Sequence, residues 1–205
     1  LADTATGRLI GSLAAAGGLS SVLWAGPEQI TGAMRRGEVP IQGTGRRLAP
    51  VSLQLGFTAD EFGYLIDLGL PVPQQQGQTM FGRDPIIKRE LIWVGPTLRP
   101  AATLLQRTAR GVRVAGEGRS RSATQLDLAL PPWASVLDEL VDPVHRPELA
   151  AVRDVVRGWR FYDSFRVDPD APARLPQVGT RTEVLAADGQ DLAPTIATIV
   201  ESAWE

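Results

Sequence analysis

Carboxylate pairs and one histidine are the side chains of this sequence whose types suit acid–base or metal chemistry. Zinc sites use three or four ligands, and a chain with one histidine and no cysteine offers too few. The DPDAP stretch that begins at Asp168 lacks the glycine and glutamate spacing of a calcium loop. We therefore expect Asp168 to form a turn by bonding backbone amides, and His145, which lies between two prolines, to have a structural role at a helix entry. The carboxylate pairs are Asp138–Glu139, Asp168–Asp170 and Asp188–Asp191.

Motifs for nucleophilic attack or phosphate binding are missing from the sequence. There is no G-x-S-x-G, the motif that would mark a serine nucleophile. A P-loop reads G-x-x-x-x-G-K-[ST], and the sole lysine, Lys88, follows Ile87 rather than a glycine. The stretch GTGRR at residues 43–47 matches the end of that motif only superficially. The sequence therefore provides no phosphate loop of its own.

Composition places the chain among ordinary globular proteins. Its 205 residues are 43% hydrophobic and 21% charged, with a net charge of -2. No cysteine is present, which excludes disulfides and thiol catalysis. No apolar run approaches the roughly 18 residues that a membrane span requires, and residues 1–13 do not resemble a signal peptide. We expect no membrane association and a cytoplasmic location.

Arginines along one predicted hairpin raise the possibility of nucleic-acid binding. They are Arg107, Arg110, Arg113 and Arg119, with GRSRS at residues 118–122. Such a cluster suits phosphate contacts. A solvated strand pair is the alternative, and the acidic total charge favours it.

Hydrophobic periodicity predicts an antiparallel sheet between residues 51 and 130. Apolar residues alternate over 51–57, 62–70, 86–94, 103–108, 111–115 and 126–130, which gives five or six strands. In the third run, Ile87, Leu91 and Trp93 are expected to face opposite to Lys88 and Glu90. The connections are too short for helical crossovers, so the strands should be antiparallel.

Helical spacing appears on both sides of this sheet region. A short helix should end at Gly17–Gly18, and others should cover 136–141, the segment from Pro147 to Gly158, and a last segment capped by Asp191. Residues 159–167 look like one more strand. The sum is an α+β fold, an antiparallel sheet flanked by helices. We expect one domain or partial domain over 1–205, with helix and loop in 1–50, strands in 51–130, and helices, an aromatic strand and a loop in 131–205.

The stretch from Gly158 to Ile199 resembles a segment of predicted bacterial ATPases of the AAA family in the RecF/SMC-like, ABC-type branch. The matching pieces are W-x-F-Y-D at 159–163, D-P-D-A-P-x-R at 168–174, G-T-R-T-x-V-L at 179–185 and D-G-x-D-L-A at 188–193. SVLWAGP at 21–27 and IKRELIWVGP at 87–96 are also similar to that family. The likeness thus extends over most of the chain.

This resemblance implies an interior part of an ABC-type ATPase head, whose complete form binds and hydrolyses ATP with Mg²⁺. The P-loop, signature sequence, Walker B acid and switch histidine of the family are absent, so no catalytic residue carries over and the chain alone should be inactive. Such ATPases generally use a glutamine in a strand-to-helix loop to sense the metal and the attacking water. Gln177 is the candidate here, and Arg181 is a second nucleotide-proximal candidate that could equally pin the loop by hydrogen bonds. The expected partners are the remaining half of the head and a second copy.

A non-enzymatic function is also consistent with the absence of the ATPase motifs. The chain would then be a non-enzymatic, β-rich interaction domain that has lost its ATP motifs. A third hypothesis is a nucleic-acid clamp segment, which predicts binding that weakens steeply with salt. An ATPase interior should expose apolar surface and self-associate, whereas a self-contained domain should cover its own.

Overall fold

The alternating segments form a single meandering sheet. The computed structural model describes residues 1–24, 26–27, 29–41, 50–71, 80–116, 123–139, 145–162 and 165–203. Within these residues six strands lie side by side in chain order, and each pairs antiparallel with the next. The expected α+β class, an antiparallel sheet with helices, is confirmed. The strands are β1 (Leu53–Thr58), β2 (Phe62–Gly69), β3 (Ile86–Val94), β4 (Thr103–Thr108), β5 (Gly111–Val114) and β6 (Thr124–Leu126).

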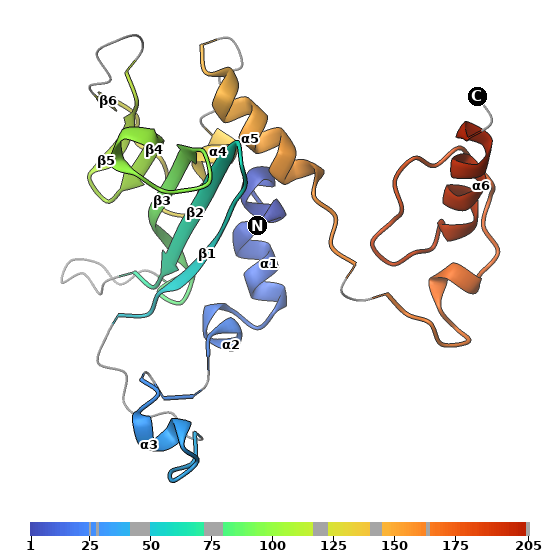
Figure 1. Cartoon of the computed structure of the whole chain (residues 1–205), viewed down its shortest axis with the longest axis horizontal. Coiled ribbons are helices and arrows are strands. Elements are labelled where there is room, and N and C mark those ends of the chain that lie inside the picture. The colour runs from blue at the N-terminus through green and yellow to red at the C-terminus, as the bar shows by residue number, and fades with distance from the viewer. Residues whose placement is uncertain are drawn as a thin grey trace. The chain divides into compact units, whose positions relative to one another are not determined.

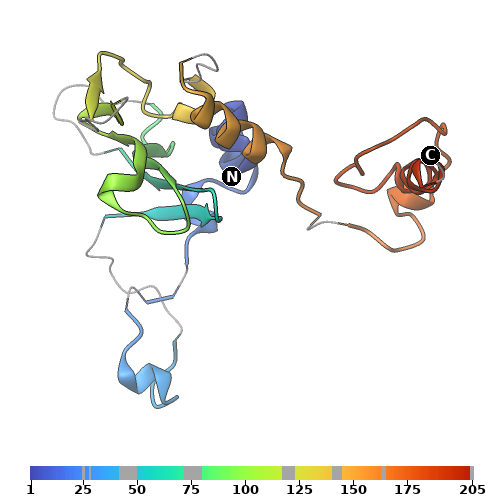
Figure 2. The same cartoon turned by 45° about the horizontal axis from the view of Figure 1, so that its top comes forward.

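Helices cover one face of this sheet. Figures 1 and 2 both show α1, α4 and α5 on the same side of the strands. Their apolar residues and those of β2 to β5 belong to one buried cluster, which includes Leu13, Tyr64, Leu105, Leu137 and Val152. The helices are α1 (Leu9–Ala15), α2 (Leu19–Val22), α3 (Gly32–Arg35), α4 (Val136–Glu139), α5 (Pro147–Gly158) and α6 (Leu192–Ser202), with 3-10 turns at Ala2–Thr6 (η1), Pro100–Ala102 (η2) and Pro172–Arg174 (η3).

Strand register decides which side chains face those helices. Tyr64 pairs with Ile92 across β2 and β3, and Glu90 pairs with Arg107 across β3 and β4. Because side chains alternate along a strand, Glu90 and Ile92 share one face of β3. Glu90 faces opposite to Leu91 and Trp93, as expected. Ile87 was expected to share the face of those two residues, but the register shift between Asp67 and Leu68 pairs Ile87 with Leu68 and places it on the Glu90 face.

The chain divides into two compact units, Leu1–Gly158 and Trp159–Glu205. The sequence had suggested one domain or partial domain over 1–205. The first unit contains the sheet and α1 to α5, and the second contains η3 and α6. No helix within the described residues combines the length and apolar character that crossing a membrane requires.

Three local expectations were wrong. The described residues between Trp159 and Val167 form no strand, because none of the described strands pairs with them. The alternating run at 126–130 contributes only its first residue to β6. Asp191 lies at the N-cap of α6, but its side chain does not cap the helix and instead accepts a hydrogen bond from the Ala186 amide at 2.8 Å. The predicted helix over 136–141 is described as far as Glu139.

Candidate functional site

A polar network lies in the first unit between the sheet and the helices. The Glu90 carboxylate is fully buried and accepts hydrogen bonds from the Tyr64 hydroxyl at 2.6 Å and the Ser135 hydroxyl at 2.5 Å. It also accepts one from the Val136 amide at 3.0 Å, at the start of α4. Arg107 Nη1 lies 3.6 Å from Glu90 Oε2. Four segments of the chain thus meet at one carboxylate.

Burial shifts the proton affinities of this network. Loss of water raises the pKa of Glu90, although its hydrogen bonds and Arg107 favour the charged form. Burial, and then the neighbouring Glu90 charge, raises the pKa of Tyr64 well above its ordinary value. Desolvation lowers the pKa of Arg107. The ion pair of Glu90 and Arg107 offsets part of the cost of burying both groups.

The geometry gives this network a structural role. Arg107 donates to the backbone oxygens of Ala134 and Pro131, the latter at 2.7 Å, so it fastens the segment before α4 onto β4. A carboxylate with no exposed surface cannot meet a substrate without local opening. One sequence signal points to this cluster: Glu90 is two residues from Ile92 and therefore lies on the same face of the strand.

The same network corrects the hypothesis of a basic hairpin. Arg107 is 5% exposed and faces the helices, whereas Arg113, across from Gln106, is exposed. The two arginines therefore cannot form one outward face. Arg110 is exposed near the hairpin turn, while Arg119 and the rest of GRSRS lie outside the described residues, as does GTGRR at 43–47.

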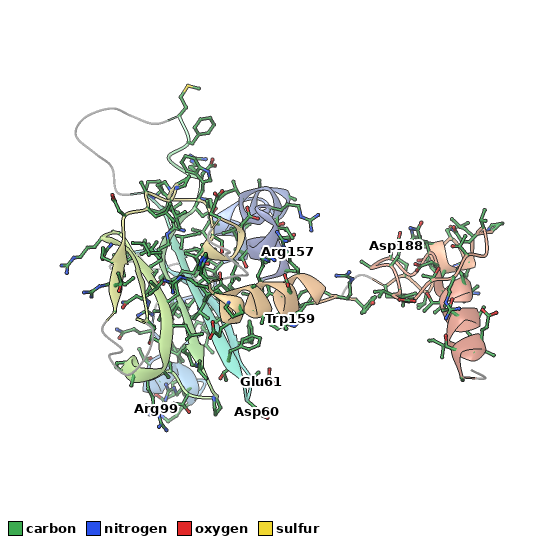
Figure 3. The ribbon with its side chains drawn as sticks, turned by 90° about the horizontal axis from the view of Figure 1, so that it is seen from above. Asp60, Glu61, Arg99, Arg157, Trp159 and Asp188 are labelled. Carbon is green, nitrogen blue, oxygen red and sulfur yellow. The ribbon has the colours of Figure 1, made fainter. Side chains whose placement is uncertain are left out.

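A second set of polar contacts, made by Arg157, joins the N-terminal turn η1 to α5. Arg157, labelled in Figure 3, donates from Nε to the Ala5 backbone oxygen at 2.5 Å. Its Nη2 lies 3.5 Å from Asp138 Oδ1 at the end of α4. Ala5 and Thr4 have no exposed surface. Arg157 therefore holds η1, α4 and α5 together.

The carboxylate pairs form turns and ion pairs in the described structure. Asp168 accepts from the Asp170 amide at 3.1 Å and pairs with Arg166 at 2.6 Å, which confirms the expected turn. Asp188 likewise accepts from the Gln190 amide at 3.2 Å. Within the described ranges, no group of three histidine, aspartate or glutamate side chains is arranged to hold a metal.

Contacts within the second unit join the segment that begins at Trp159 to the loop before α6, and that loop to α6 itself. The Tyr162 hydroxyl donates to the Leu185 oxygen at 3.0 Å, which connects the first piece to the third. The Thr182 amide donates to the Thr198 hydroxyl on α6 at 2.8 Å. Gly189 has φ of 72°, and a Cβ at that position would overlap the Phe165 ring. Tyr162, Thr182 and Gly189 thus have local structural roles in this unit.

Gln177 and Arg181 lie in the loop before α6. Gln177 is exposed and lines a shallow hollow of about 290 Å³, together with Leu175, Gly179 and Gln190. Arg181 Nη2 donates to the Ser202 hydroxyl at 3.4 Å, at the last residue of α6. Such a contact is of the kind expected if Arg181 holds its loop in place by hydrogen bonds. The two side chains are four positions apart in sequence, and only Gln177 lines the hollow.

Apolar side chains on the second unit are largely uncovered. Ala171 and Pro194 are the apolar residues buried within its described part. On α6, Ile196, Ile199 and Val200 are 52%, 62% and 53% exposed and lie at helical spacing on one side. Other exposed hydrophobic residues of this unit are Phe161, Tyr162, Val167, Leu175, Val178 and Val184.

Comparison of the chain with protein-family models, curated proteins and solved structures finds no match.

Proposed function

We propose that this chain forms the antiparallel sheet and flanking helices of an ABC-type ATPase head. The complete protein would bind and hydrolyse ATP with Mg²⁺, and would act in the cytoplasm. The support comes from the four sequence pieces between Trp159 and Ala193 that resemble this family. Hydrogen bonds of Tyr162, Thr182 and Asp191 hold these pieces together within the second unit.

The uncovered apolar surface of α6 carries the proposal. A unit of this size that exposes Ile196, Ile199 and Val200 on one side of a helix has not buried its own hydrophobic surface. An ATPase head would supply the missing cover from its remaining half. This observation disfavours a self-contained domain, which would bury such a stripe. A second copy is the other partner that this surface would suit.

Within that head, Gln177 would approach the nucleotide. Its loop is held at both ends, by η3 before it and by the bond from Thr182 to α6 after it. Gln177 itself is exposed, so its amide is accessible to a metal ion or an attacking water. Arg181 would hold the loop through Ser202 rather than contact phosphate. ATP and Mg²⁺ would be bound mainly by motifs that this sequence does not contain.

The β-rich interaction domain has one observation in its favour. The unit Leu1–Gly158 buries a continuous apolar cluster beneath its sheet, so it has a core independent of the second unit. A protein with that core alone could serve as a non-enzymatic binding module. The exposed face of α6 would then be its contact surface.

The test begins with the source reading frame on both sides of these 205 codons. A P-loop upstream and an acidic Walker B strand downstream are expected. The extended protein should hydrolyse MgATP, and Gln177→Ala should lower kcat by about 10²-fold, the effect of removing a group that positions water or charge in a transition state. Gln190→Ala, which alters the same hollow, is the matched control and should retain activity.

Two results would overturn the proposal. One is an extended frame without these motifs. The other is ATP turnover by the 205-residue chain itself above a heat-treated control, since the chain has no P-loop.

A further inference from the structure

A separate hollow lies on the sheet unit, at the open end of the β4–β5 hairpin and beside the start of α5. Its volume is about 950 Å³, at the upper end of the range of small-molecule sites. Three arginines line it: Arg99 directly precedes η2, Arg113 lies in β5, and Arg146 directly precedes α5. Figure 3 labels Arg99 on this unit. Three separate segments thus bring an arginine to one hollow.

These three arginines differ from six others in the described structure. Arg8, Arg36, Arg107, Arg153, Arg157 and Arg166 each have a carboxylate within 4.0 Å. In contrast, the guanidinium groups of Arg99, Arg113 and Arg146 form no ion pair or hydrogen bond with another described residue. Glu148 is the one carboxylate among the described lining residues. Among the described lining residues, positive charge therefore exceeds negative charge.

The rest of the lining is mainly apolar. Leu104, Ala115 and Pro147 line it, together with the small residues of η2. Polar groups from Thr103 and Gln106 are interspersed. A ligand that fits this lining has an anionic group for the arginines and an apolar body for the remaining surface.

We propose that this hollow binds a small organic phosphate, with its phosphate at Arg99, Arg113 and Arg146. Guanidinium groups form paired, charge-assisted hydrogen bonds with phosphate oxygens. A nucleic-acid strand is a poorer fit, because no phenylalanine, tyrosine or tryptophan is among the described lining residues to stack a base. The site is distinct from the loop of Gln177, and its existence does not depend on the proposed ATPase.

Phenyl phosphate and inorganic phosphate are suitable probes, titrated into the 205-residue chain by calorimetry in EDTA. Saturable binding of phenyl phosphate is expected with a Kd of about 1 mM or lower, and inorganic phosphate should bind several-fold more weakly because it lacks the apolar body. Arg113→Gln should weaken phenyl phosphate binding about tenfold, since it removes hydrogen bonds to a charged group. Arg146→Gln should act in the same direction.

Arg110→Gln is the matched control, because Arg110 is exposed near the turn of the same hairpin and does not line the hollow. It should change the Kd less than twofold, and circular dichroism should show all three variants folded. Equal weakening by Arg110→Gln and Arg113→Gln would overturn the proposal, since binding would then follow net charge. It would also be overturned by an absence of saturation, or by displacement of phenyl phosphate by micromolar single-stranded oligonucleotide.

Discussion

The Tyr64 hydroxyl donates a hydrogen bond to Glu90 Oε1 at 2.6 Å, from β2 to β3, and neither side chain has any exposed surface. A buried carboxylate is stable only when its oxygens are bonded, and Tyr64, Ser135 and Val136 supply those bonds. The contact therefore joins the centre of the sheet to the segment that begins α4. It also identifies the side chains whose removal should damage the fold most.

Glu90→Ala should lower the free energy of unfolding by about 3–5 kcal/mol, because it leaves Arg107 buried without its carboxylate. Urea unfolding followed by circular dichroism measures this change. Glu183→Ala, at an exposed position, is the control and should alter stability by less than about 0.5 kcal/mol. Equal effects of the two substitutions would show that the Glu90 network does not stabilise the protein.

Tyr64→Phe should cost about 1.5–3 kcal/mol, because it removes a buried hydrogen bond to a charged acceptor. Tyr162→Phe removes a hydroxyl that bonds a backbone oxygen at an exposed position. We expect the second change to cost about 0.5–1.5 kcal/mol at most. The same urea titration compares them, and the opposite order would contradict the burial of Tyr64.

The pH dependence of stability should report the raised pKa of Glu90. The folded protein holds the Glu90 proton more tightly than the unfolded chain, so ionisation of Glu90 costs stability as pH rises from its ordinary pKa of 4.5 through the higher folded value. Lowering the pH through that window should therefore raise the stability of the wild type relative to Glu90→Gln, which does not titrate. Urea unfolding at several pH values gives the difference. A difference that stays constant, or changes in the other direction, would refute the raised pKa.

Gly189→Ala should loosen the second unit. At φ of 72°, an alanine costs about 1–2 kcal/mol, and its Cβ would also overlap the Phe165 ring. Amide hydrogen exchange should become faster across α6 and the loop before it. Gly179→Ala is the control, since it has open space and no positive φ. Unchanged exchange in Gly189→Ala would mean that Phe165 does not pack on this turn.

The uncovered face of α6 should make the chain self-associate. We expect Ile199→Glu to shift sedimentation toward the monomer, because it places a charge in the centre of the apolar stripe. Val155→Glu, at an exposed position on α5, is the control and should leave the association unchanged. A wild-type chain that is monomeric at high concentration would remove the need for a partner on α6.

The local pattern of hydrophobic residues was sufficient to predict an element where the segments that pack against it follow directly in the chain. Alternation in residues 51–57, 62–70 and 86–94 predicted β1 to β3, since each of these strands pairs with the next one in the chain. Apolar spacing with Pro147 and Gly158 predicted α5 in the same way. The period of the hydrophobic residues reports which side of an element is buried.

The same pattern could not tell whether a segment finds a partner. Residues 159–167 have the composition of a strand, yet the described part of them is irregular, because a strand needs a neighbour for its backbone hydrogen bonds. Asp191 is a residue type that often caps helices and stands at the N-cap of α6, but its carboxylate accepts a hydrogen bond from the Ala186 amide instead. For Gln177, the sequence indicated a loop, and the structure adds that it is exposed beside α6.

By itself, the sequence determined the α+β class and the approximate position of most elements, because hydrophobic periodicity is a local property. Only the tertiary structure decided that Glu90, Tyr64, Ser135 and Arg107 meet, and that Arg99, Arg113 and Arg146 line one hollow. Those groupings depend on strand register, and they bring together residues as much as 47 positions apart, such as Arg99 and Arg146 at the hollow. A charged residue is buried only where distant parts of the chain bring it a partner, and no local pattern contains that information.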